Sequence, residues 1–174
     1  WQRAEICGPI KASVLTKPQV VAAMASRAKR PILIVGHEAA EHNYEGEHMI
    51  DIAIQFSKSR KIPIVATAHI VGEFLKRGCK PAASMPIVDI ANRLRDPDWK
   101  GLDGRGGYDL AMFVGVPYPM QWVVFSGLKH STRAPTTISL DRFYQPQATW
   151  SFPNISEKEW HDQLKAIANE FGVK

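Results

Sequence analysis

The run Pro31-Ile32-Leu33-Ile34-Val35-Gly36 is the feature that most constrains what this chain can fold into. Four consecutive branched apolar residues follow a proline and stop at a glycine. A strand exposed on one face would alternate apolar with polar residues, so this run predicts a strand that is buried on both faces. A parallel sheet covered by helices on both sides provides that environment. The run therefore predicts an α/β fold.

Three more segments repeat this pattern. A second apolar run, 110–114, also stops at a glycine, Gly115. Residues 62–67 are a largely apolar segment, and residues 136–140 are a further predicted strand. Helical patterns lie between them, at about 49–61 and 119–130. This alternation predicts a three-layer, doubly wound, mostly parallel sheet in a single Rossmann-like α/β domain over 1–174. If the chain reverses direction across the sheet, the Ile32 and Leu110 strands become central neighbours.

Other segments give weaker local predictions. The sequence Thr16-Lys17-Pro18 predicts a helix start with Thr16 as the cap, and Ser156 with Glu159 forms a capping-box pattern before a last helix. We expect residues 1–16, the polar stretch 37–48 and the aromatic, proline-rich stretch 143–155 to be irregular. Because exposed aromatic residues often anchor interfaces, we interpret 143–152 as a contact with another protein.

A ligand site is expected where the two central strands end. In open α/β sheets, ligands bind outside the carboxyl ends of the strands. We therefore predict a cofactor site built from residues that follow these strands or lie close to their ends, namely Gly36, His37, Thr67, Gly115, Tyr118 and Asp141. Gly-x-Gly-x-x-Gly and Walker-type phosphate loops are absent. The two glycines would either hold a phosphate on backbone N–H groups or permit two tightly packed turns.

Charge and composition exclude several functional classes. The net charge is +5, with the cations scattered mostly at predicted helix ends, so we expect no nucleic-acid face. Residues 110–128 carry no charge, but Gly115, Pro117 and Pro119 interrupt them, which argues against a membrane span. The sequence shows no signal-peptide pattern, and Cys7 and Cys79 form no Cys-x-x-Cys motif. We expect a cytoplasmic protein.

No motif points to chemistry of the chain's own. His37 and His42 are five residues apart, whereas the zinc-protease motif requires a spacing of four, so no metal site is expected. Cys79 lies among lysines and arginines, and we interpret it as a structural thiol. The pair Asp141-Arg142 would either grip a ribose hydroxyl and a phosphate or form a salt-bridged strand end.

Several segments together resemble the epsilon subunits of the archaeal acetyl-CoA decarbonylase/synthase complex. The resemblance runs nearly end to end, and the pattern at 138–146 followed by 151–154 is its most specific part. The matching segments are residues 30–36, 96–104, 108–115 and 138–146.

The resemblance implies a fold similar to the NAD/FAD-binding domains of deoxyhypusine synthase and sirtuins, and to the middle domain of thiamine-dependent enzymes. It implies a non-catalytic chain in acetyl-CoA metabolism and methanogenesis that stabilises the CO dehydrogenase alpha subunit, a nickel and iron–sulfur protein. It also implies assistance in electron transfer to FAD, for which the predicted cofactor site would serve. We expect a hetero-oligomer, with self-association left open. The alternative is a free-standing dinucleotide-dependent enzyme of sirtuin-like or thiamine-enzyme type.

Overall fold

The computed structural model describes residues 8–67, 70–131 and 133–172, so Cys7 lies outside the described part. These residues form a seven-stranded sheet in the order β1-β9-β8-β7-β2-β5-β6, together with a separate two-stranded hairpin, β3-β4. Every neighbouring pair in the larger sheet is parallel. The prediction of an α/β fold with a mostly parallel sheet is confirmed. The closer likeness to deoxyhypusine-synthase-like domains, and the extent of the single domain, stay predictions.

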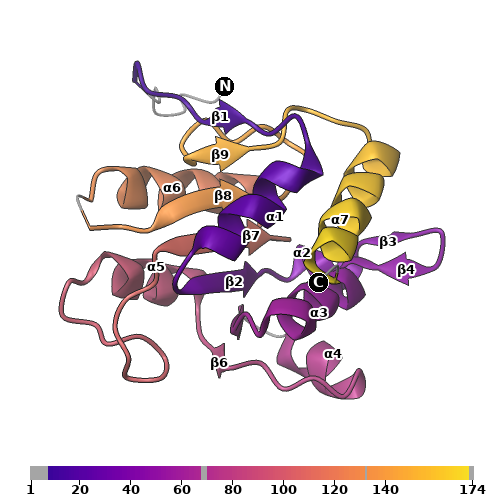
Figure 1. The fold of residues 1–174 in the computed structure, drawn as a ribbon, viewed down its shortest axis with the longest axis horizontal. Coiled ribbons are helices and arrows are strands. Elements are labelled where there is room, and N and C mark those ends of the chain that lie inside the picture. The colour runs from indigo at the N-terminus through magenta and orange to yellow at the C-terminus, as the bar shows by residue number, and fades with distance from the viewer. Residues whose placement is uncertain (1–7, 68–69, 132, 173–174) are drawn as a thin grey trace.

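Strands and helices alternate along most of the chain (Figure 1). The strands are β1 (Ser13–Val14), β2 (Pro31–Val35), β3 (Asn43–Tyr44), β4 (Glu47–His48), β5 (Ile64–Ala66), β6 (Ala83–Ser84), β7 (Leu110–Val114), β8 (Thr136–Ser139) and β9 (Trp150–Ser151). The helices are α1 (Pro18–Arg27), α2 (Glu38–Glu41), α3 (Met49–Arg60), α4 (Val71–Lys76), α5 (Ile87–Arg95), α6 (Tyr118–Lys129) and α7 (Glu157–Gly172).

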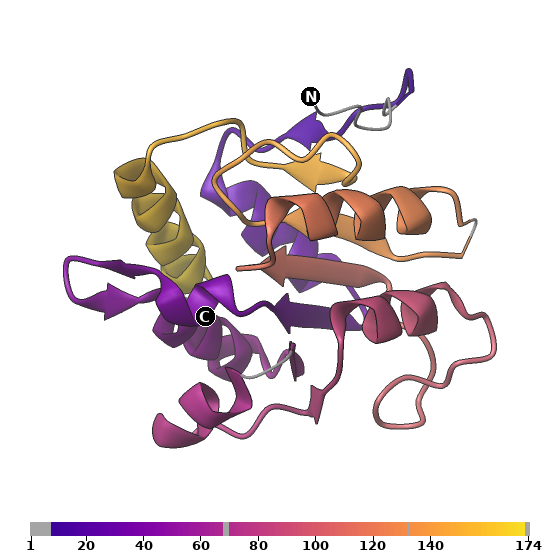
Figure 2. The ribbon, with the colours of Figure 1, turned by 180° about the vertical axis from the view of Figure 1, so that it is seen from behind.

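Helices cover both faces of the sheet, which explains the uninterrupted apolar run of β2. Leu33 and Val35 pack with α1, α3 and α7 in one hydrophobic cluster. Ile32 and Ile34 point the other way and pack with α5 and α6 in a second cluster. Figure 1 shows the first helical layer in front of the sheet, and Figure 2 shows α5 and α6 on the opposite face. The predicted three-layer arrangement is therefore present.

The two glycine-terminated strands are central neighbours, as predicted. β2 pairs in parallel with β7 along its whole length, from Pro31 opposite Leu110 to Val35 opposite Val114. β5 lies on the other side of β2, and β8 on the other side of β7. Because the chain moves outward in one direction through β5 and in the other through β8, the point where the strand order reverses lies between β2 and β7.

Four local predictions were incomplete or wrong. β1 lies within residues 1–16 and β9 within 143–155, both of which were expected to be irregular. The polar stretch after Gly36 contains a short helix, α2, and the hairpin β3-β4. The N-cap of α1 is Lys17 and not Thr16, and no side chain caps this helix. Two-residue strands have no periodicity to detect, because their identity depends on the backbone partner beside them.

The capping box of α7 is present and sets the direction of the last helix. The Glu159 backbone N–H donates to Ser156 Oγ at 3.2 Å, and Ser156 N–H donates to Glu159 Oε2 at 3.2 Å. One helical turn after Ser156, Trp160 Nε1 donates to the carbonyl oxygen of Leu140 at 2.6 Å. This bond attaches α7 to the chain directly after β8, close to the carboxyl ends of the central strands.

Candidate functional site at the carboxyl ends of the strands

Gly36 and Gly115 lie against each other, directly after β2 and β7. Gly36 N–H donates to Val114 O at 2.8 Å, and Glu38 N–H donates to Gly115 O at 3.0 Å. A methyl group on Gly36 would overlap the carbonyl of Gly115, and one on Gly115 would overlap the backbone of Ala39. Gly115 also has φ +68°. Of the two interpretations left open by the sequence, this contact supports glycines needed for tightly packed turns.

Asp141 is half-buried behind this contact and holds it in place. Its Oδ1 accepts a hydrogen bond from Gly115 N–H at 2.8 Å, and its Oδ2 accepts one from Gln121 Nε2. Burial raises the pKa of Asp141 to about 7, and nearby Glu38 adds to that rise, although the hydrogen bonds from Gly115 and Gln121 lower the pKa. Asp141 thus binds a backbone group of the fold itself, and a grip of the Asp141-Arg142 pair on a ribose hydroxyl and a phosphate stays a prediction.

Gln121 is a site residue that the sequence analysis missed. It is 1% exposed and its amide joins three groups. Gln121 Nε2 donates to Asp141 and to Val116 O at 2.8 Å, while its Oε1 accepts from Ser139 Oγ at 2.9 Å. The available signal was its position on the mainly apolar buried face of α6, with Val124, Phe125 and Leu128. A polar residue on such a face must find partners in the interior.

The other predicted residues are not all in one place. Tyr118 begins α6 and lines a small cavity together with Asp141. His37 is the N-cap residue of α2, next to Gly36. Thr67 follows β5, and its Oγ1 donates to Val35 O at 3.1 Å. It therefore binds the end of β2 on the β5 side, whereas Asp141 lies on the β7 side. All six follow strands of the same sheet, but only Tyr118 and Asp141 line this cavity.

The cavity beside Asp141 is small. It holds about 40 Å³, and Glu38, His42, Arg142 and Trp160 complete much of its wall. His42 packs edge-on against Trp160, with the ring centroids 5.2 Å apart. Sites for drug-sized ligands enclose roughly 300–1,000 Å³. The six predicted residues therefore do not by themselves form a space large enough for a dinucleotide, because the turns after β2 and β7 pack directly against each other.

A larger open groove lies next to this cavity, on its Tyr118 side. It has a volume of about 470 Å³, and we call it the aromatic groove; its wall consists of Tyr118, Phe143, Tyr144, Pro146 and Asn154. Phe143 is 46% exposed and Tyr118 is 38% exposed. The Arg142 guanidinium lies over the Phe143 ring, 4.5 Å from its centroid.

Among the aromatic residues of the stretch 143–152, the exposed one, Phe143, lies at its beginning. Phe143 and Tyr144 line the groove, whereas Phe152 is 1% exposed and belongs to the core. Trp150 is half-buried and packs against the same core cluster. The residues of this stretch that line the groove are therefore Phe143, Tyr144 and Pro146, and the contact with another protein stays a prediction. The sequence could not reveal this division, because β9 turns the second half of the stretch inward.

Neither a metal site nor a spanning helix is found in the described residues. Across 8–67, 70–131 and 133–172, no three His, Cys, Asp or Glu side chains are grouped as metal ligands. Within those same ranges, no helix has the length and apolar character needed to cross a membrane.

Comparison with known proteins agrees with the resemblance noted in the sequence. Residues 1–168 match the profile of a family described as CO dehydrogenase beta subunit/acetyl-CoA synthase epsilon subunit. The acetyl-CoA decarbonylase/synthase complex subunit epsilon of Methanothrix soehngenii is 38% identical over 90% of this chain and 81% of its own length. Subunit epsilon 1 of Archaeoglobus fulgidus is 38% identical over 81% of this chain and 74% of its own.

A third relative covers nearly the whole chain. The subunit epsilon of Methanothermobacter thermautotrophicus is 32% identical over 98% of this chain and 94% of its own length. A match of this extent, together with the family profile, covers every element of the carboxyl-end site described above. The chain therefore belongs to the CO dehydrogenase beta subunit/acetyl-CoA synthase epsilon subunit family.

Proposed function

We propose that this chain is an accessory subunit of the CO dehydrogenase component of an acetyl-CoA decarbonylase/synthase complex, and that it stabilises the catalytic alpha subunit by docking through the aromatic groove. The relatives are named as epsilon subunits of that complex. Family membership disfavours the alternative of a free-standing dinucleotide-dependent enzyme. In this role the chain acts in the cytoplasm, within archaeal acetyl-CoA metabolism and methanogenesis.

Hydrogen bonds make the aromatic groove rigid. Tyr118 Oη donates to Tyr144 O at 3.1 Å, and Gln145 Nε2 donates to Tyr118 O at 2.9 Å. Tyr144 is held at both ends, because its N–H donates to Asn154 Oδ1 at 2.9 Å and its Oη donates to Ala12 O at 2.7 Å. A surface that is already ordered loses little conformational freedom on binding, which favours tight association.

Two further apolar side chains of α6 are exposed. Val123 is 64% exposed and Met120 is 39% exposed, on the same helix as Tyr118. Aromatic residues and methionine are enriched where protein interfaces are fully buried. The exposed Phe143 at the mouth of a rigid groove is the observation that carries this proposal.

A docking experiment with the alpha subunit tests it. The Phe143→Asp variant places a charge in the groove, so its affinity for the alpha subunit should fall by at least about thirtyfold, the size expected for a central aromatic anchor. Size-exclusion chromatography of the mixed subunits measures association. The half-life of CO oxidation by the alpha subunit at elevated temperature measures stabilisation, and it should lengthen with the parent chain but not with the variant.

The matched control is Leu75→Asp. Leu75 is 56% exposed on α4, on the β5 side of the sheet and away from the groove, so this variant should bind as the parent does. Docking through the groove is refuted if Phe143→Asp co-elutes with the alpha subunit as well as the control. An accessory role is refuted if the parent chain neither co-elutes with the alpha subunit nor prolongs its activity.

As a second proposal, we infer that the chain assists electron transfer to FAD. The FAD would bind in the aromatic groove and not at the turns after β2 and β7. The groove's volume of about 470 Å³ is in the range of ligand sites, and Tyr118 belongs both to the groove and to the predicted set. Bound FAD would accept electrons, while Tyr118 and Phe143 would supply aromatic surface for its ring system. Titration with FAD should quench flavin fluorescence and raise the Tm of the parent chain, but not of Phe143→Asp. Absence of both effects in the parent leaves only the docking role.

A further inference from the structure

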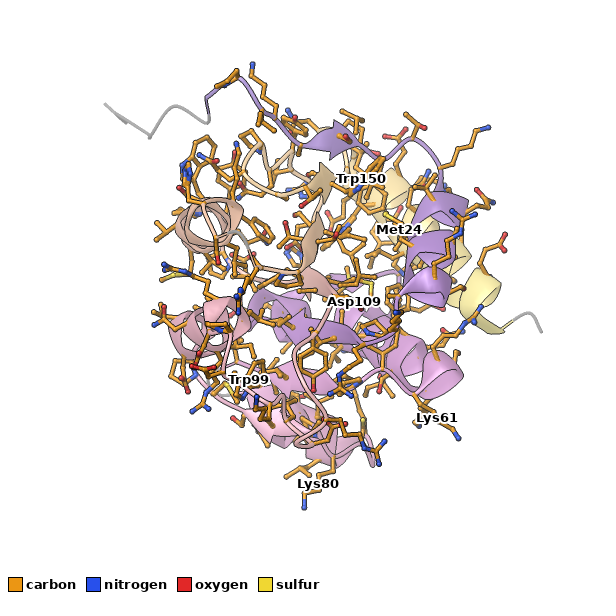
Figure 3. The ribbon with its side chains drawn as sticks, turned by 60° about the vertical axis from the view of Figure 1, so that its left-hand side comes forward. Met24, Lys61, Lys80, Trp99, Asp109 and Trp150 are labelled. Carbon is orange, nitrogen blue, oxygen red and sulfur yellow. The ribbon has the colours of Figure 1, made fainter. Side chains whose placement is uncertain are left out.

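A second cavity lies at the opposite edge of the sheet, by the amino ends of β2, β5 and β7. It holds about 390 Å³, and its wall includes Lys29, Arg30, Arg60, Lys61, Asp103 and Tyr108. Figure 3 turns this edge toward the viewer, with Trp99 and Lys61 on either side of Asp109. The carboxyl-end site and the aromatic groove share none of these residues. A ligand in this cavity would therefore bind independently of the proposed function.

Positive charge is in excess in this cavity. Four cationic side chains line it, and Asp103 is the carboxylate among its described lining residues. Arg30 neutralises Asp103 through Nη2–Oδ1 at 2.5 Å, an interaction that holds the pKa of Asp103 below its usual value. Lys29 and Lys61 have no salt bridge in the described part of the chain and are both exposed. The cavity is thus suited to an anion.

The wall of the cavity is fixed before any ligand arrives. Lys29 N–H and Arg30 N–H donate to Asp109 Oδ2 and Oδ1, at 2.7 and 2.9 Å. Arg30 Nε donates to Gly107 O at 3.1 Å, and its guanidinium lies 5.0 Å from the Tyr108 ring centroid. Trp99 packs against the same ring at 5.6 Å. Because Arg30 and Trp99 already contact the Tyr108 ring, recognition of a ligand rests on the charged groups and not on stacking of a nucleobase against this ring.

Lys61 adopts a backbone conformation that a lysine does not favour. It caps the carboxyl end of α3 with φ +53°, in the left-handed region where glycine is the usual residue. Cations near helix carboxyl ends complement the helix dipole, and this accounts for Arg60 in the last turn. The helix dipole accounts less well for Lys61, which lies beyond the last turn in a strained conformation. It also does not explain why Lys29, from a different segment, lines the same cavity as Lys61.

We propose that this cavity binds a small anion bearing one or two phosphate groups, held by Lys29, Arg60 and Lys61. Ammonium and guanidinium groups make strong, charge-assisted hydrogen bonds to phosphate oxygens. The same chemistry would serve free pyrophosphate or the phosphates of a nucleotide. Concavity and volume favour a small ligand over an acidic stretch of another protein.

Titration calorimetry in phosphate-free buffer of constant ionic strength tests the proposal, with inorganic pyrophosphate and ADP as probes. The parent chain should give saturable binding of pyrophosphate, and the double variant Lys29→Ala/Lys61→Ala should bind at least about tenfold more weakly. The matched control is Lys17→Ala/Lys58→Ala, which removes two exposed lysines that do not line the cavity and should bind as the parent does. Equal affinities for the two probes identify phosphate alone as the ligand group, and tighter ADP binding identifies a nucleotide.

The single variant Lys61→Gly separates binding from folding. Glycine suits φ +53°, so this variant should have a higher Tm than the parent while binding pyrophosphate more weakly. Three results would overturn the proposal: no saturable binding of either probe, equal weakening in the control double variant, or equally tight binding of a hexaglutamate peptide. The last result would show that the cavity selects charge and not phosphate.

Discussion

At the scale of single residues, Asp141 shows how a chemically reactive group can be used for architecture. Its carboxyl group lies where parallel sheets bind ligands, yet both oxygens accept hydrogen bonds from the protein itself, from Gly115 and Gln121. Sequence alone could place Asp141 at the end of a strand, because that depends only on the apolar run before it. It could not reveal the role, because Gln121 lies on a different element and meets Asp141 only after folding.

The raised pKa of Asp141 predicts a dependence of stability on pH. Its pKa is about 7 in the folded chain against an ordinary value of 3.8. Between these values the folded state holds a proton that the unfolded state has released, so the free energy of unfolding falls as pH rises from about 4 to about 7 and is level above that. This residue contributes a slope of up to about 1.4 kcal/mol per pH unit. Asp141→Asn should lose that contribution.

Urea unfolding of the parent and of Asp141→Asn at several pH values from 4.5 to 8, in steps of about half a unit, measures this slope. Asn keeps an acceptor for Gly115 N–H, so the variant should still fold. Asp89→Asn is the control, since Asp89 is an exposed partner of Arg93 on α5, and it should follow the parent's curve. Parallel pH curves for the parent and Asp141→Asn would show that Asp141 is ionised throughout this range.

At the scale of elements, the turns after β2 and β7 behave as one unit. Two uninterrupted apolar runs that stop at glycine were enough to predict both strands and their adjacency, because burial on both faces leaves few places for such a strand. The strands β1 and β9 have two residues each, which is too short for a sequence period to be detected. The hairpin β3-β4 was missed because its residues are mainly polar and it lies outside the sheet.

Replacing Gly36 by alanine should break this unit. The added methyl group meets the carbonyl of Gly115, which is backbone and cannot rotate away, so we expect a loss of about 3 kcal/mol or more in the free energy of unfolding. The control is Gly72→Ala in α4, where an added methyl group has no neighbour within 4 Å and should be neutral or stabilising by up to about 1 kcal/mol. Chemical denaturation compares them, and equal midpoints would contradict the close approach.

At the scale of the whole molecule, the sheet separates two surfaces of different character. The carboxyl edge carries a rigid aromatic groove, and the amino edge carries a basic cavity. The fold class could be predicted because it follows from the alternation of apolar strands with helices, and each of these segments is recognised from its own residues. The groove and the cavity could not, because each joins side chains from distant segments: Tyr118 meets residues 143–146, and Lys29 meets Lys61.

The pairing of β1 with β9 has a consequence for how the protein is made. Ser13 lies opposite Trp150, so the strand nearest the beginning of the described chain has its only sheet neighbour close to the end. On a ribosome, β1 emerges long before the segment it must join. Its backbone N–H and C=O groups therefore remain without their partners in the sheet until residues 150–151 have been synthesised, so this edge of the sheet forms only after β2 to β8 have been made.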